Sequence, residues 1–449
     1  MNLKFFLILF FICSFLYAQE TADSQETLQR NTLKYGTETE IVNLIQTLKT
    51  ESLDYLDNEL IVLADTSRNQ KILTGIFAFF SEREKKGLEK RAVRAIEDQE
   101  NEKNDTIIAA IDYLGRVKAA EDLPVLKNVI ENGDRRFLNS ALRAYGRAGG
   151  GSGSESTEYL IGYYENGNPE GENQREIITA LGAIASVSAV DFLAGIAADN
   201  DERVPLRMAA LESIAKIGDT SAEGRAGLDA VVACVTAADP NVRSAAVGAL
   251  GPFSGASVDE AILDAFRDSF FRTRIAAAQA SRQRKLAAAV PYLKFRAERD
   301  EVPSVREESV RALGAIANSE SIAILDELFT ERKNNERVRI SSGEMLMQIN
   351  PAKYLDNVIK ELDEAKQKNQ TALYNGLLKI IGTAKCANME AITRRLMESS
   401  GVVEKSYALD MAANNNLSSL AAEIKAVAEG KSESLAAKAR RTLEKLGIK

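Results

Sequence analysis

A unit of 31 to 36 residues recurs along this 449-residue chain, and the repetition limits the folds that the chain can adopt. The clearest copy reads DPNVRSAAVGALG, from Asp239 to Gly251, and is followed by a polar turn and a second apolar stretch. Its apolar residues recur at helical spacing, and its inner alanines allow neighbouring helices to approach closely. Because one such unit cannot bury its apolar face alone, successive copies are expected to stack.

The first helix of each unit is predicted to end at a glycine, since glycine adopts the left-handed conformation of a helix C-cap at little cost. In the same unit Asp239 and Pro240 are predicted to be the N-cap and the first helical residue. Seven copies share the terminal glycine: Gly115, Gly146, Gly182, Gly218, Gly251, Gly314 and Gly382. In four less regular copies the equivalent positions are Gln283, Ile349, Asn414 and Gly447.

These repeats resemble the HEAT-repeat superfamily, especially its bacterial members with short, alanine-rich units that end in ALG. The resemblance covers residues 105–449 and implies an all-α fold, a HEAT-repeat solenoid (alpha-alpha superhelix) of about ten to eleven helical hairpins. Residues 19–104 are expected to form a divergent helical cap region, with two earlier copies that end near Gly36 and Phe80 and a charged helix at 82–102.

A basic residue follows the valine at the start of the first helix in several copies, as it does in the HEAT family. The clear examples are Arg243, Arg306 and Arg339, and the weaker ones are Arg175 and Arg274. By this resemblance the five arginines form a series of equivalent residues in different repeats, which we call the arginine ladder. The structural interpretation is that each arginine pairs with a carboxylate of the adjoining turn, and the alternative is direct contact with a ligand.

Three segments depart from the repeat pattern. Residues 149–154 (GGGSGS) are predicted to form a flexible loop, either a hinge or a tolerated insertion. Residues 167–173 (GNPEGEN) are predicted to form a longer acidic loop, and residues 281–290 (SRQRKLAAAV) replace the expected ALG ending with a basic run.

The N-terminus has the pattern of a secretory signal peptide at residues 1–18. Lys4 is followed by an apolar run of about 12 residues, which is short of the ~20 that span a bilayer, and Ala18 is a small residue at the predicted cleavage position. An uncleaved anchor and a lipid-modified Cys13 are the alternatives. The mature protein is therefore expected to be soluble and periplasmic or secreted. Two cysteines remain after cleavage, and they are predicted to be buried small hydrophobic residues too far apart for a disulfide: Cys234 and Cys386.

The residue types disfavour catalysis. The chain has no histidine, which removes the commonest general base and the His-Glu di-iron motifs of HEAT-like enzymes such as deoxyhypusine hydroxylase. It contains neither a phosphate-binding loop motif nor cysteine pairs at zinc spacing. We therefore expect no enzymatic activity, no cofactor and no metal site.

Charge is distributed unevenly along the chain, whose net charge of −8 disfavours nucleic-acid binding. Residues 150–202 contain ten acidic residues and one basic residue, whereas residues 267–299 contain nine basic and two acidic residues. Opposite charges of this kind also allow self-association. The partner-binding candidates in the basic segment are Arg272, Arg274, Arg282, Arg284, Lys285, Lys294, Arg296 and Arg299.

Together these features predict an exported scaffold or adaptor that binds protein partners in a cell-envelope assembly. The alternative is a binding or accessory factor, peripheral to the membrane, for an anionic envelope polymer or lipid that docks at the basic segment 267–299.

Overall fold

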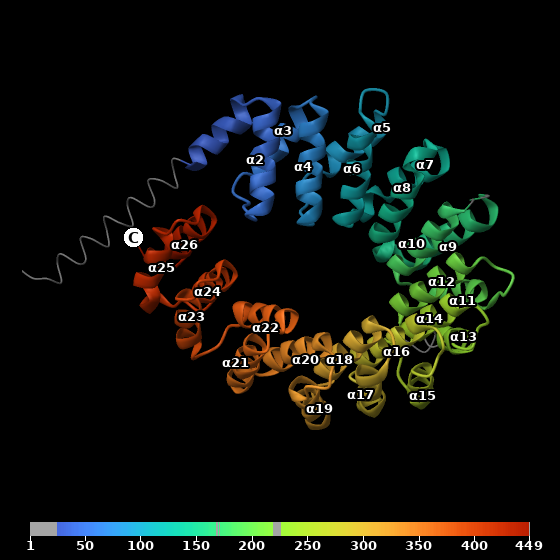
Figure 1. Ribbon diagram of the computed structural model, residues 1–449. Coiled ribbons are helices and arrows are strands. Elements are labelled where there is room, and N and C mark those ends of the chain that lie inside the picture. The colour runs from blue at the N-terminus through green and yellow to red at the C-terminus, as the bar shows by residue number, and fades with distance from the viewer. Residues whose placement is uncertain (1–24, 168, 170, 219–225, 449) are drawn as a thin grey trace, which may run out of the picture. The chain divides into compact units, whose positions relative to one another are not determined.

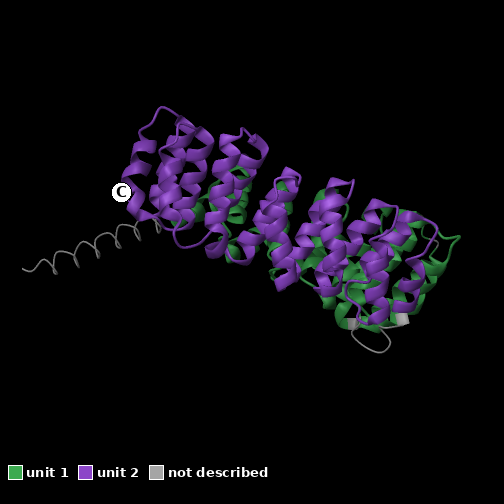
Figure 2. Ribbon diagram, turned by 60° about the horizontal axis from the view of Figure 1, so that its bottom comes forward, with its two compact units in different colours: residues 1–227 green, residues 228–449 purple. Residues whose placement is uncertain are grey.

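The computed structural model describes residues 25–167, 169, 171–218 and 226–448, and its chain divides into two compact units, residues 1–227 and 228–449 (Figure 2). Every regular element in the described residues is a helix, which confirms the all-α class. None of the described helices is long and apolar enough to cross a membrane. The predicted signal peptide lies outside the described residues.

The two units are built from the same kind of helix (Figure 1). Unit 1 contains α2 (Glu38–Thr50), α3 (Asp57–Thr66), α4 (Gln70–Glu82), α5 (Glu89–Glu97), α6 (Asn104–Arg116), α7 (Leu123–Asn132), α8 (Arg135–Ala148), α9 (Gly153–Asn166), α10 (Glu172–Ile184), α11 (Val190–Ala198) and α12 (Val204–Ile217). After α13 (Ala226–Cys234), unit 2 contains α14 (Pro240–Ala249), α15 (Ala256–Ala265), α16 (Phe271–Arg284), α17 (Val290–Arg299), α18 (Pro303–Ile316), α19 (Ser319–Thr330), α20 (Glu336–Ile349), α21 (Pro351–Gln367), α22 (Thr371–Thr383), α23 (Met389–Met397), α24 (Val402–Asn414), α25 (Ala421–Ala428) and α26 (Glu433–Lys445).

Each unit is a two-layered stack of helical hairpins. The even-numbered helices pack on one another in chain order, as α4 does between α2 and α6 and α16 does between α14 and α18. Most odd-numbered helices pack against the next even-numbered helix and touch each other little. This arrangement is the predicted solenoid of stacked hairpins, and its core is made of the faces that the two layers share.

The glycines of the ALG endings have a different role from the one that the sequence predicted. Gly115, Gly146 and Gly182 lie inside α6, α8 and α10 instead of ending them. A Cβ atom on Gly146 would come within 2.7 Å of the Cα atom of Ala180 in the next even-numbered helix. The prediction was therefore wrong for most of these positions, because the residue is small to allow close helix packing and not to reverse the chain.

Among the seven predicted glycines, Gly218 is the one whose φ of 67° fits a C-cap. Several other helices end at a non-glycine residue in the left-handed conformation, such as Ala185, Lys285 and Ala317. The predicted N-cap is confirmed: the Asp239 carboxylate accepts hydrogen bonds from the backbone N–H groups of Asn241 and Val242, and α14 begins at Pro240.

Three further predictions need correction. Gly149–Ser152 forms a short 3-10 helix and α9 already begins at Gly153, so residues 149–154 are not a loop. A helix that includes residues 25–35 does end just before Gly36, as predicted, but α2 is the helix that packs on α4. The first helix of the copy before Phe80 is therefore α2, which ends at Thr50. The charged helix predicted at 82–102 is the shorter α5, and two residues of the acidic segment 167–173, at positions 168 and 170, lie outside the described residues.

Candidate functional site

Two arginines of the ladder, Arg243 and Arg274, each join the turn of one hairpin to the corresponding turn of the next. In unit 2 the Arg243 side chain donates from Nη1 to the carbonyl oxygens of Ala237 and Ala238, in the turn before its own helix, at 2.9 and 3.0 Å. Its Nε and Nη2 donate to the two carboxylate oxygens of Asp268, in the following turn, at 2.8 and 3.1 Å. One side chain thus fixes two consecutive turns through a bidentate ion pair.

Arg274 repeats this arrangement one hairpin later. Its Nη1 donates to the backbone carbonyl of Asp268, and its Nε and Nη2 donate to the carboxylate of Asp300 at 2.8 and 2.9 Å. The Asp300 side chain is fully buried and also accepts a hydrogen bond from the Val302 N–H group. Burial alone would raise the pKa of the Asp300 carboxyl, but the bonds from Arg274 and Val302 outweigh it and hold the pKa below its usual value.

The remaining predicted ladder residues divide into two groups. Arg339 is buried and pairs with Glu361, which lies in α21 and not in a turn. Arg306 donates to the carbonyl oxygens of Asp300 and Glu301 but forms no ion pair with a described residue, so the carboxylate partner predicted for it was wrong. Arg175, by contrast, is exposed and makes no side-chain ion pair within the described chain, so its prediction as part of a paired ladder was wrong.

Arg207 is a ladder residue that the sequence pattern missed, because leucine precedes it in place of valine. It is buried in α12 and donates from Nε to the Ala197 carbonyl at 3.0 Å. Like Arg243, it is the fourth residue after the N-cap of its helix. Counting from the N-cap instead of searching for a Val-Arg pair would have found it.

Most of the predicted basic segment is engaged within unit 2. Arg274 is buried in the ladder as described above. Four other candidates form ion pairs: Arg282 with Glu308, Arg284 with Asp259, Lys294 with Glu327 and Arg296 with Asp300. Because these charges are already balanced by neighbours, they are poorly placed to attract a partner.

Three candidates of the basic segment have exposed side chains and no ion pair with a described residue: Arg272, Lys285 and Arg299. The Arg272 guanidinium lies 5.9 and 5.8 Å from the ring centres of Phe270 and Phe271. Phe295 on α17 is 57% exposed, with Arg296 over its ring at 5.5 Å. The basic segment therefore presents three exposed cations without an ion pair to a described residue, of which Arg272 lies next to aromatic rings.

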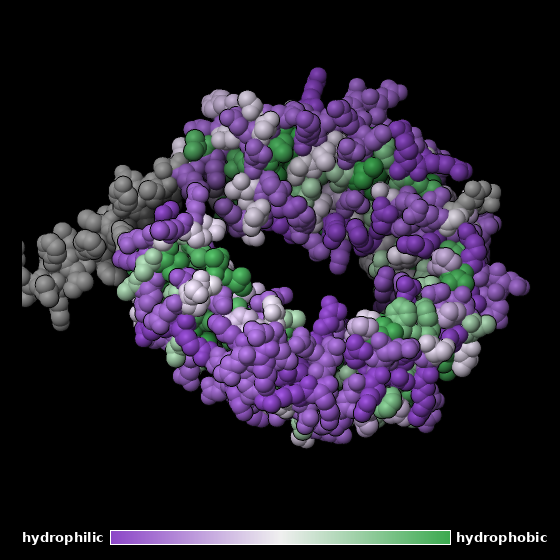
Figure 3. All heavy atoms as spheres, viewed as in Figure 1, coloured by the Kyte–Doolittle hydropathy of each residue, from purple (hydrophilic) through white to green (hydrophobic). Residues whose placement is uncertain are grey.

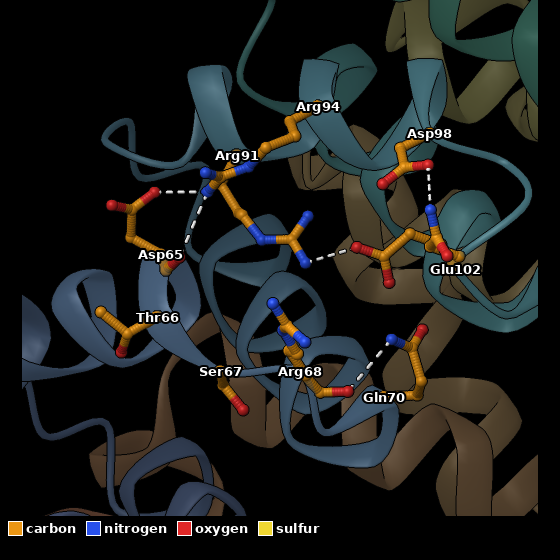
Figure 4. Close-up of a pocket in the computed structure, with 10 residues that line it drawn as sticks. Asp65, Thr66, Ser67, Arg68, Gln70, Arg91, Arg94, Asp98 and Glu102 are labelled. Atoms are coloured by element: carbon orange, nitrogen blue, oxygen red, sulfur yellow. Dashed lines mark hydrogen bonds and ion pairs between the residues drawn. The ribbon is translucent and has the colours of Figure 1, made fainter.

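The ladder is absent from the first four even-numbered helices of unit 1. The fourth position after the N-cap is Ile41 in α2, Leu73 in α4, Ile107 in α6 and Leu138 in α8, so no arginine occupies these turns from the even-numbered layer. A polar pocket of about 560 Å³ lies here, between the α3–α4 turn and α5 with the turn that follows it (Figure 4). Its walls are Asp65, Thr66, Ser67, Arg68, Gln70, Arg91, Arg94, Asp98, Asn101 and Glu102.

Arg91 is the central residue of this pocket. Its side chain is 7% exposed and comes from α5, where it donates from Nε to the Ala64 carbonyl at 3.0 Å and from Nη2 to the Glu102 carboxylate at 2.6 Å. The buried Nη1 atom has no hydrogen-bond partner among the described residues. Arg94 on the same helix pairs with Asp65, as Figure 4 shows.

Arg68 completes the basic part of the pocket. Its side chain is exposed and forms no ion pair with a described residue. In Figure 4 its guanidinium is directed toward that of Arg91. None of these three arginines, Arg68, Arg91 and Arg94, was predicted as a site residue. The one sequence feature that marks this region is that α4 and α6 have no ladder arginine.

The described residues contain no group of three or more Asp, Glu or Cys side chains arranged to hold a metal ion. Cys234 is buried, as predicted, whereas Cys386 is only partly buried. Burial raises the pKa of the Cys386 thiol above its usual value.

The repeats match a described protein family over almost their full length. The model of the family described as "Spirochaete HEAT repeat protein" matches residues 33–442. The chain belongs to this family. The match includes most of the region at 19–104 that was predicted to be divergent.

Among solved structures, the helical repeats are similar to those of karyopherins. A crystal structure of Kap121p is 12% identical with a TM-score of 0.44, and the match covers 95% of this chain and 54% of Kap121p. A crystal structure of importin beta is 12% identical with a TM-score of 0.43, and the match covers 95% of this chain and 70% of importin beta. The chain thus spans about half the length of Kap121p. A comparison with curated proteins found no match.

Proposed function

We propose that this HEAT-repeat protein is an exported, non-catalytic scaffold that binds protein partners in a cell-envelope assembly. A solenoid presents side chains from many consecutive hairpins on one extended surface, which suits the binding of other polypeptides. The periplasmic or secreted location rests on the signal-peptide pattern at residues 1–18.

The observation that carries the scaffold proposal is the arginine ladder of unit 2. The ladder links the α13–α14, α15–α16 and α17–α18 turns through Arg243, Asp268, Arg274 and Asp300. Turns that are joined in this way keep a fixed spacing, so the surface is already organised before a partner binds and less entropy is lost on binding. Figure 3 shows that the visible surface is largely hydrophilic, which favours polar and water-mediated contacts with the partner.

The test is crosslinking in cells followed by purification of the full-length protein expressed with its native N-terminus. Capture of one specific envelope protein, at a constant ratio to the scaffold, is the expected result. A ladder variant, Arg243→Met, should weaken this capture because it releases the α13–α14 turn from the next turn. If no protein is captured above the level of an unrelated exported control, the scaffold proposal is wrong.

A second function, binding of an anionic envelope polymer or lipid, is favoured by Arg272, Lys285 and Arg299, the exposed cations of the basic segment without ion pairs. Phe295, which is exposed on α17 within the same segment, provides an apolar group for a membrane interface. Its test is co-sedimentation with vesicles that contain phosphatidylglycerol, compared with vesicles of phosphatidylcholine alone.

The variant for this second function changes Arg272, Lys285 and Arg299 to Gln. Its matched control changes Arg116, Arg135 and Arg175 to Gln, which are three exposed arginines of unit 1. Binding that disappears in the first variant, persists in the control and weakens as salt rises would support the lipid function. Equal sedimentation of both variants would exclude the basic segment as the lipid-binding surface.

A further inference from the structure

The polar pocket in unit 1 has two cationic groups that face one another. Arg68 and Arg91 approach it from the α3–α4 turn and from α5, and each lacks part of its possible hydrogen bonding. Like charges repel at short range, and a group that accepts hydrogen bonds from both would remove the repulsion. An oxyanion between two guanidinium groups is the arrangement that their geometry favours.

Arg91 is held in place before any ligand arrives. The Ala64 carbonyl and the Glu102 carboxylate fix two of its nitrogen atoms, and burial leaves the side chain little freedom. The buried donor Nη1 remains without an acceptor, a situation that typically costs about 1–3 kcal/mol. The exposed Arg68 side chain is free to move aside, so a ligand that enters beside it can reach Nη1.

The other walls restrict the charge of the ligand. Three acidic residues, Asp65, Asp98 and Glu102, balance the three arginines, so the pocket has no net positive charge. Such a site disfavours a dianionic phosphate, which the nearby carboxylates would repel, and it tolerates a single negative charge. The singly charged oxyanion of proteins is the carboxylate.

The uncharged walls match a polypeptide backbone. Gln70 and Asn101 each use one amide N–H within the chain, on the Arg68 carbonyl and the Asp98 carboxylate, and each has a second N–H to donate. Thr66 and Ser67 add hydroxyl oxygens. An extended peptide presents backbone N–H and C=O groups that can bond to such side chains. The volume of about 560 Å³ lies within the range typical of ligand pockets.

We infer that this pocket binds one carboxylate group, presented by an extended segment of a protein partner and held between Arg68 and Arg91. The inference rests on the proposed scaffold function for the kind of partner, and it adds the site and the chemical group that the site recognises. It also assigns a binding role to unit 1, whereas the sequence had placed the candidates in unit 2.

The test is selection of peptides from a bead-bound library of random octapeptides with amidated C-termini, using the mature protein. Aspartate or glutamate at one fixed position is the expected enrichment. The best peptide is then compared with its Asn or Gln counterpart, and loss of the carboxylate should weaken binding about 10-fold, as expected for a charge-assisted hydrogen-bond pair.

The variant Arg68→Gln locates the site, because this exposed residue has no ion pair whose loss would disturb folding. It should reduce the affinity for the acidic peptide about 10-fold and leave the affinity for the amide counterpart unchanged. Arg175→Gln is the matched control, since Arg175 is also an exposed arginine of unit 1 without an ion pair, and it should bind as the normal protein does.

Three results would overturn the inference: no enrichment of acidic residues, equal binding of acidic and amide peptides, or an unchanged affinity in Arg68→Gln. Strong competition by millimolar inorganic phosphate against the acidic peptide would also contradict the preference for a single charge. If cell crosslinking still captures a protein partner in any of these cases, the scaffold function stands and only the carboxylate pocket is wrong.

Discussion

Replacing Asp300 by alanine should destabilise unit 2 strongly. The Asp300 carboxylate is fully buried and is the bidentate partner of Arg274, whose side chain is 6% exposed. Its removal takes away the buried counter-charge of Arg274, which among the described residues keeps only the exposed Glu301 carboxylate at 3.8 Å, and it also removes the Arg296 pair at 3.4 Å. Breaking a buried ion pair in this way typically costs about 3–5 kcal/mol in the free energy of unfolding.

A matched ion pair on the surface provides the control. Asp264 pairs with Arg267 at 2.8 Å, but the side chains are 78% and 63% exposed. Solvent screens such a pair, so Asp264→Ala should change the free energy of unfolding by about 0–1 kcal/mol. The difference between the two variants measures the effect of burial, since both lose one aspartate that pairs with an arginine.

The assay is urea unfolding followed by circular dichroism, together with hydrogen exchange of α16, α17 and α18. Exchange is needed because long repeat arrays can unfold in parts, and then a single free energy is not defined. Asp300→Ala should speed exchange in these three helices and leave the exchange of α22 to α26 much less affected.

A double variant separates the unpaired charge from the lost contacts. Arg274→Met combined with Asp300→Leu removes both buried charges, while Arg296 loses its Asp300 partner in both variants. The double variant should therefore recover part of the stability that Asp300→Ala loses. The reasoning is refuted if Asp300→Ala loses less than about 1 kcal/mol, or if the double variant is less stable than Asp300→Ala.

Three shorter predictions follow from other features. The pKa of Asp300 is lower in the folded state than in the unfolded state, so its stabilising effect is complete above about pH 4 and is lost as the pH falls below that value. In an acid titration followed by circular dichroism, the normal protein should therefore lose more stability than Asp300→Asn. Gly146→Ala should lower the free energy of unfolding by about 1–3 kcal/mol in thermal unfolding, since its Cβ would lie 2.7 Å from the Cα atom of Ala180. Gly162→Ala, where an added Cβ meets nothing within 4 Å, should instead stabilise α9 by about 0.5–1 kcal/mol, and a loss there would contradict the packing argument. N-terminal sequencing of the protein from its native host should begin at Gln19, whereas an intact Met1 would rule out cleavage of the signal peptide.

The fold was predictable because each hairpin carries its own signals. The helical spacing of apolar residues, the N-cap Asp239 and the first-turn Pro240 act within a few residues of one another, so they can be recognised without any knowledge of the neighbours. The carboxylate partners of Arg243, Arg274 and Arg339 were predictable in kind for the same reason, since a buried arginine needs a nearby negative charge.

The role of the ALG glycines was not predictable from one unit. Gly146 looks like a helix end in the sequence, but the atom that excludes a side chain belongs to Ala180, 34 residues away. The ion pairs of the basic segment were not predictable for the same reason. Arg284 pairs with Asp259 and Lys294 pairs with Glu327, and both acidic residues lie in other helices of unit 2. Charge counted along the sequence therefore overstated the charge available to a partner.

The sequence by itself determined the all-helical class, the hairpin period and the two ladder arginines that join consecutive turns, Arg243 and Arg274, since these depend on local periodicity and capping. The tertiary structure decided which cations are free, why glycine is required between the even-numbered helices, and where the pocket of Arg68 and Arg91 lies. These properties depend on the distances between groups in different hairpins. Stacking sets those distances, and no single repeat contains them.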